Sequence, residues 1–256
     1  MKRLAALLGA AIVLAALPGG ADAQQSQPAP EVAPQPGPHD RPHMLDQAIF
    51  AHLLFDQLEG RFGFAEGNSF RWEAEGWIGT DENRVWLLSE GRVADNQLDD
   101  GIQQLFYGRA VTTYFNALIG MRWDIDSLPT RGWGAIGILG TAPQWFRVSA
   151  FGYVSGDGHL AARLAASYDI QITQRLILQP QVELNFYAKD DPARHVGAGL
   201  SELDAGLRLR YEITRQFAPY VGITYLGQYG ATANYVSEAG GSTQQLRFTM
   251  GVRTWF

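Results

Sequence analysis

The sequence predicts an all-β protein: a closed antiparallel transmembrane β-barrel of about twelve strands, preceded by a disordered, Pro-rich N-terminal arm. Three observations predict this fold. The chain begins with an export signal, apolar and polar residues alternate along most of its length, and it ends on an aromatic residue. Strict alternation indicates strands whose two faces meet different surroundings, because successive side chains of a strand point to opposite sides.

Residues 1–23 predict a secretory signal peptide. Lys2 and Arg3 give a positive start, Leu4–Leu17 is an apolar run, and Ala21–Ala23 is a small-x-small cleavage motif. A membrane anchor is the alternative, but a spanning helix needs roughly 20 apolar residues. Every later apolar cluster is interrupted by charged or amide side chains. Since only helices and closed barrels span hydrocarbon, an exported membrane protein of this sequence is expected to be a barrel.

Residues 24–44 form the expected arm on the periplasmic side. This segment contains six prolines and almost no large apolar residue before Met44, so it lacks the side chains for a core. We expect it to stay extended. From residue 45 to residue 256 the character changes to strands.

The last segment shows the alternation most clearly. Its apolar face carries Leu246, Phe248, Met250, Val252, Thr254 and Phe256. The same pattern recurs within residues 115–124, 159–169, 175–186 and 202–213. A soluble sandwich also alternates, but these segments approach the roughly 9–11 residues that cross a bilayer at a tilt. The final Trp255–Phe256 resembles the terminal signal of bacterial outer-membrane barrels.

Twelve segments follow this pattern. We expect them to start near Gln47, Ser69, Arg84, Ile102, Phe115, Gly132, Gln144, His159, Gln174, Gly199, Gln216 and Gln244. With both termini in the periplasm, the two longest connections, Asp190–Ala198 and Tyr229–Thr243, fall on the outer side, as barrels prefer. The pattern does not decide which side chains of Ala48–Arg61 and of Ile102–Ala110 point to lipid and which to the interior, because each segment mixes apolar and polar residues.

The composition limits the possible functions. The net charge of −6 argues against nucleic acid as a partner, and the absence of Cys excludes disulfides and Cys-based zinc sites. The polar faces mix acids such as Glu73 and Glu183 with bases such as Arg163 and Arg208. This mixture predicts an interior of paired charges, with a narrow polar path between the pairs as a further possibility. A wide open pore is not expected, because such a pore takes roughly 16–18 strands.

An enzyme is not expected. The sequence contains no phosphate loop and no dinucleotide motif. Asp190 and Asp191 with His195 imitate a rim protease of the outer membrane, but no spacing argument brings these side chains together.

Several motifs resemble the copper resistance protein B (CopB/PcoB) family. They are Asn83–Leu87, Leu176–Pro180, Lys189–Pro192, Leu207–Ile213, Phe217–Gly222 and the ending Gly251–Phe256. The resemblance covers nearly all of residues 42–256 in order. It implies a barrel in the outer membrane of a Gram-negative bacterium, in contact with its lipid, that binds copper ions and helps to transport or sequester them. It also implies a periplasmic multicopper oxidase as a partner.

The family often carries a Met- and His-rich arm, which this chain reduces to His39–Met44. Copper favours imidazole nitrogen and, as Cu(I), thioether sulfur. His39, His43 and Met44 therefore form the first candidate ligand set, at the periplasmic mouth of the barrel. A solvated linker with chance His residues is the alternative.

Two further candidates lie in the barrel sequence. His52 comes early in the first strand, with Asp56 and Glu59 after it, and His159 leads the polar face of its strand. Met121 and Met250 fall on the lipid face and are expected to be plain apolar contacts. Copper is expected as ligand or cargo and not as a catalytic cofactor. The alternative function is a small polar channel or structural barrel without a metal role.

Overall fold

A computed structural model describes residues 48–63, 67–94, 97–125, 130–142 and 146–256. The predicted signal peptide and the arm, with His39, His43 and Met44, lie outside these ranges. All described residues belong to one compact unit, Leu45–Phe256. No helix in the described ranges combines the length and the hydropathy needed to cross a bilayer.

The described residues form one antiparallel sheet. Its strands are β1 (Phe50–Gly63), β2 (Ser69–Gly79), β3 (Asn83–Ala94), β4 (Gln97–Ala110), β5 (Phe115–Asp124), β6 (Arg131–Ala142), β7 (Phe146–Ser155), β8 (Leu160–Tyr168), β9 (Ile170–Gln171), β10 (Leu176–Tyr187), β11 (Gly199–Tyr211), β12 (Phe217–Gln228) and β13 (Gln244–Trp255). A 3-10 helix, η3 (Pro192–Arg194), and a helix, α2 (Gly230–Glu238), lie in the two longest connections.

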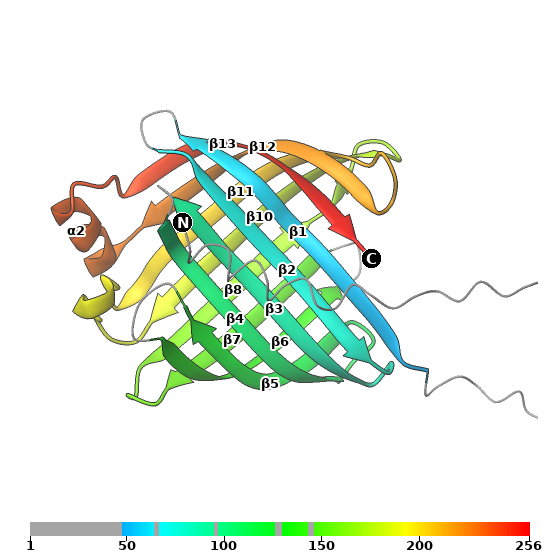
Figure 1. The fold of residues 1–256 in the computed structure, drawn as a ribbon, viewed down its shortest axis with the longest axis horizontal. Helices are drawn as coiled ribbons and strands as arrows, with labels where there is room; N and C mark the ends of the chain where they lie inside the picture. Colours follow the sequence, from blue (N-terminus) through cyan, green and yellow to red (C-terminus); the bar gives the residue numbers. More distant parts are fainter. Residues whose placement is uncertain (1–47, 64–66, 95–96, 126–129, 143–145) are drawn as a thin grey trace, which may run out of the picture. The chain divides into compact units, whose positions relative to one another are not determined.

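The sheet closes into a barrel. The first strand, β1 (blue in Figure 1), pairs with the last, β13 (red), and every other strand pairs with its neighbours in sequence. The two-residue β9 continues β8 along β10, so twelve strands make up the wall. Closure leaves no strand with an unpaired edge. The predicted twelve-stranded antiparallel barrel is confirmed.

Most described strands begin within three residues of their predicted starts. The exception is the fourth, which begins at Gln97 and not near Ile102. Its first residues, Gln97–Gly101, are mostly polar and look like a turn in the sequence. They form a strand because they pair with β3, where Arg92 lies opposite Asp100.

Apolar side chains cover the outside of the wall, as the alternation predicts. Ile136 on β6 is 65% exposed and Ile119 on β5 is 63% exposed, whereas Asp204 and Arg208 on β11 are each 1% exposed. Met121 and Met250 lie on the apolar outer face, as predicted. The outer face matches hydrocarbon, and the charged groups lie in the interior.

A β-bulge settles the open facing of the first strand. The pairing of β1 shifts register between Phe55 and Leu58. Before the bulge Leu54 is buried in the interior, and beyond it Gln57 and Glu59 are buried there instead. One extra residue thus moves the inward positions from even to odd numbers, which a strict period of two does not predict.

The interior is not charged all round. On the side formed by β3 to β7 it is filled by a cluster of apolar and aromatic side chains: Trp86, Phe106, Leu118, Trp133, Ala135, Leu139, Phe151 and Tyr153. This cluster explains why Ile102–Ala110 has no clear facing in the sequence. Phe106 points inward and Leu105 and Tyr107 point outward, so both faces of β4 carry apolar residues.

The two ends of the barrel differ. Short turns join β2 to β3, β4 to β5, and β11 to β12, at the end where the C-terminus lies (Figure 1). The opposite end carries the longer connections with η3 and α2. We call these the short-turn end and the long-loop end. The contrast matches the predicted contrast between periplasmic turns and outer loops.

We expect Ile136→Arg to destabilise the barrel in lipid by about 2–4 kcal/mol, because a charge near the middle of the lipid face meets hydrocarbon. The measurement is urea unfolding in lipid vesicles, followed by tryptophan fluorescence. The matched control is Ser237→Arg on exposed α2, which should unfold like the wild type. Equal unfolding midpoints for the two variants would contradict the assignment of the lipid face.

Candidate functional site

A network of ion pairs crosses the barrel interior from one wall to the opposite wall. Arg71 on β2 contacts Glu183 on β10 at 3.2 Å and Asp204 on β11 at 3.3 Å. Arg163 on β8 pairs with Glu90 on β3 and contacts Glu183 at 2.6 Å. We call the network the ion-pair belt, and its members are Glu59, Arg61, Arg71, Glu90, Arg163, Glu183, Asp204 and Arg208.

The ion-pair belt is balanced in charge and almost free of solvent. It contains four carboxylates and four guanidiniums, and none of their side chains is more than 10% exposed. Glu59 is its most central acid: it accepts hydrogen bonds from Arg61 at 2.7 Å and from Arg208 and Tyr220 at 2.9 Å. Buried charges persist only when they are paired and hydrogen-bonded in this way.

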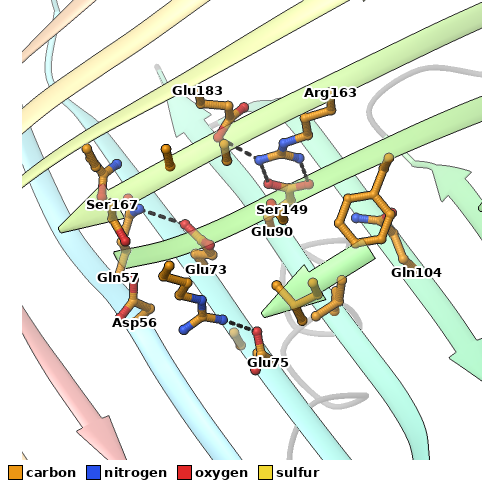
Figure 2. A pocket seen from close by; sticks show the side chains of 18 of the residues that line it. Asp56, Gln57, Glu73, Glu75, Glu90, Gln104, Ser149, Arg163, Ser167 and Glu183 are labelled. Atoms are coloured by element: carbon orange, nitrogen blue, oxygen red, sulfur yellow. Dashed lines mark hydrogen bonds and ion pairs between the residues drawn. The ribbon is translucent and has the colours of Figure 1, made fainter. Parts of the chain in front are cut away.

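A cavity of about 100 Å³ lies against the ion-pair belt, on its short-turn side (Figure 2). Glu90, Arg163 and Glu183 of the belt border it. The rest of its lining includes Asp56, Gln57, Glu73, Glu75, Arg147, Ser149, Ser167 and Gln181. The cavity exists because the sheet supplies small Ser and Ala side chains at inward positions of β7 and β8, opposite the longer acids of β2 and β3.

An aromatic group surrounds His52 nearer the short-turn end. The imidazole ring centre of His52 lies 6.0 Å from that of Trp77 and 5.8 Å from that of Trp255. The Arg84 guanidinium stacks over Trp77 at 4.2 Å, and Trp77 also contacts Trp86. These residues come from β1, β2, β3 and β13, which meet because the first and last strands pair. We call His52, Trp77 and Trp255 the mouth group.

The acids expected to accompany His52 have other partners. Asp56 accepts a hydrogen bond from Arg253 at 2.7 Å, and Glu59 is a member of the ion-pair belt. Both acids bond to arginines and not to the imidazole. The expected grouping of His52 with Asp56 and Glu59 is therefore not what the fold brings together.

The other two histidines of the described ranges, His159 and His195, lie at the long-loop end. His159 follows the turn after β7, where its backbone N–H donates to Ser155 Oγ at 3.1 Å. His195 ends η3 in the left-handed conformation (φ 56°), and its ring lies 5.9 Å from that of Tyr235. Neither residue approaches His52. Among the described residues, no three His, Asp or Glu side chains gather in a way that holds a metal ion.

The sequence placed Glu73 and Glu183 correctly on the polar face, left the facing of Asp56 open and did not reveal the cavity. Alternation along a strand reports which face a side chain occupies. It does not report which side chain lies opposite across the barrel. Gln57 and Gln181, which are 124 residues apart in the sequence and 3.4 Å apart in the structure, show what only the closed fold decides.

The arrangement suits restricted passage or binding of ions. The ion-pair belt obstructs the middle of the lumen, and the cavity and the mouth group lie on its short-turn side. An ion that enters from this end meets an imidazole among aromatic rings first and a set of polar oxygens next.

We expect Arg163→Met to destabilise the barrel by about 3–5 kcal/mol, because Glu90 loses its arginine and becomes a buried unpaired charge. Ion conductance in planar bilayers should rise, since the ion-pair belt loses a link between opposite walls. Urea unfolding and single-channel recording measure the two effects. Arg109→Met, at the exposed end of β4, is the control and should change neither. A variant at Arg163 with wild-type stability and conductance would show that the belt neither braces nor obstructs the lumen.

Comparisons with known proteins agree with this architecture. The family model described as "Copper resistance protein B precursor (CopB)" matches residues 49–256. The chain is 41% identical to copper resistance protein B of Escherichia coli over 82% of this chain and 71% of that protein. It is also 41% identical to the copper resistance protein B homolog of Pseudomonas syringae pv. tomato (strain ATCC BAA-871 / DC3000), over 85% and 74% of the two chains.

A solved porin, NanC, superimposes with a TM-score of 0.54 over 79% of this chain and 98% of that porin. At 14% identity this likeness shows the fold alone. The closed barrel with an apolar outer face and the match to the family place the protein in the outer membrane. From the family model and the two relatives together, the chain belongs to the copper resistance protein B family.

Proposed function

We propose that this protein binds copper ions at the short-turn, periplasmic end of its barrel and helps to transport or sequester them, beside a periplasmic multicopper oxidase. Membership of the copper resistance protein B family supports a role in copper resistance. The observation that carries the proposal is the position of His52. It is the one described histidine in the wall of the lumen at the short-turn end.

Imidazole nitrogen is a ligand that suits both oxidation states of copper. Trp77 and Trp255 flank the His52 ring and shield it on two sides, which lowers competition from water. A single imidazole is an incomplete ligand set, and further donors have to come from a mobile segment or from the carrier that delivers the ion.

The arm offers those donors. His39, His43 and Met44 combine two imidazoles with a thioether, and β1 begins at Phe50, at the short-turn end. Met44 precedes this strand by six residues in the sequence. In this proposal residues 1–23 direct export, residues 24–44 carry the further ligands, and residues 45–256 form the barrel. His159 is a candidate ligand on the outer side.

The proposed role is not catalytic, and copper is cargo in this proposal. A small polar channel or structural barrel without a metal role is the competing function, favoured by the polar cavity. Conductance in planar bilayers that is indifferent to added copper would support that alternative.

We expect the triple variant His39→Ala, His43→Ala, Met44→Ala and the single variant His52→Ala each to bind copper at least about tenfold more weakly, because each removes ligands. Calorimetric titration of the purified protein with Cu(I) and with Cu(II) measures affinity. Periplasmic and total copper in cells report function.

His195→Ala is the matched control, since it removes an exposed histidine at the other end of the barrel. It should leave copper binding and copper accumulation at wild-type values. A wild-type protein that binds no copper in either oxidation state would contradict the ligand assignments.

A further inference from the structure

One carboxylate in the cavity has no positive partner. Every other acid that lines it contacts an arginine: Asp56 contacts Arg253, Glu75 contacts Arg147, Glu90 contacts Arg163, and Glu183 contacts both Arg71 and Arg163. Glu73 forms no ion pair within the described ranges. It accepts a hydrogen bond of 2.6 Å from Gln57 Nε2 (Figure 2).

The surrounding charges do not compensate Glu73 collectively. The ion-pair belt is neutral with four acids and four arginines, and the pairs of Asp56 and Glu75 are each neutral. When it is ionised, the carboxylate of Glu73 is therefore an excess negative charge inside a wall that faces hydrocarbon. Such a charge is costly unless a proton, water or a mobile cation compensates it.

The neighbouring side chains hold this carboxylate in place. Gln57 donates to Glu73 through its amide nitrogen, while its amide oxygen accepts a 3.0 Å hydrogen bond from Arg208 of the ion-pair belt. Arg208 thus sets the orientation of the Gln57 amide, which directs its N–H groups to Glu73 and to Gln181. One oxygen of the carboxylate is bonded in this way, and the other has no hydrogen bond in the described part of the protein.

The cavity beside Glu73 has room and ligands for a cation. A volume of about 100 Å³ accommodates several water molecules. The lining supplies oxygen from the Gln181 amide and from the hydroxyls of Ser149 and Ser167 (Figure 2). Its described residues include no histidine or methionine. Oxygen donors suit divalent cations, including Cu(II), and suit soft Cu(I) poorly.

We propose that Glu73 is the principal ligand of a divalent-cation site in the lumen, and that copper occupies it as Cu(II). This inference rests on the proposed function and deepens it. The cation lies between the mouth group and the ion-pair belt, so it occupies a second binding site, deeper in the lumen than His52. Gln57 positions the carboxylate, and the oxygens of Gln181, Ser149 and Ser167 complete the shell together with water.

The test is electron paramagnetic resonance of the purified full barrel in detergent, titrated with Cu²⁺. Two bound forms are expected. One carries nitrogen hyperfine structure and forms with an affinity at least about tenfold weaker in His52→Ala. The other has oxygen ligands only and disappears in Glu73→Gln, with an affinity at least about tenfold weaker by calorimetry. Glu82→Gln, the same substitution in the exposed turn between β2 and β3, is the matched control and should keep both forms.

A second variant keeps the proposal testable if Glu73→Gln fails to fold. Ser167→Lys places a tethered ammonium group in the same cavity as Glu73 and supplies the missing positive charge. It should remove the oxygen-only form of bound Cu²⁺ and retain the folded barrel, as measured by heat-modifiable gel mobility.

The outcomes separate this inference from the proposed function. An oxygen-only signal that persists in both Glu73→Gln and Ser167→Lys overturns the lumen site. A wild-type protein with only the nitrogen-coordinated form, weakened in His52→Ala, also overturns the lumen site while the proposed function stands. If the oxygen-only signal is lost in both variants, the lumen site is supported. If cellular copper is nevertheless unchanged in Glu73→Gln and His52→Ala, the site has no role in copper resistance.

Discussion

Closure of the sheet is the constraint on which the rest of the structure depends. A strand surrounded by hydrocarbon has no water for its backbone N–H and C=O groups, so each strand needs a partner on both sides. The pairing of β1 with β13 supplies the last of these partners. Once the sheet is closed, alternate side chains must point to lipid and to the interior, and the charged residues of the chain can only gather inside.

Two kinds of contact fill the interior. On the side of β3 to β7, apolar and aromatic side chains fill the space and exclude water. Elsewhere the ion-pair belt joins opposite walls through residues far apart in the sequence, such as Arg61 and Asp204, which are 143 positions apart. Removing one member of such a network costs more than the pair contributes, because the partner stays buried with its charge.

The residues proposed here to meet an ion first lie on the short-turn side of the belt. His52 lies among indole rings at the mouth, and Glu73 lies beside a cavity lined by polar oxygens. In the proposed route an ion meets an imidazole first and oxygen ligands next.

The sequence by itself determined the membrane barrel, because a period of two is a local property: each residue's face follows from its neighbours. It placed most strand starts, the lipid-facing Met121 and Met250, and the inward Glu183 and Arg208. The tertiary structure alone decided what depends on closure and register. The bulge in β1 turns Gln57 and Glu59 inward, the apolar wall gives β4 two apolar faces, and Glu73 is left without an arginine. Each of these depends on which side chains meet inside the closed barrel. Those side chains belong to different strands, which no local pattern relates to one another.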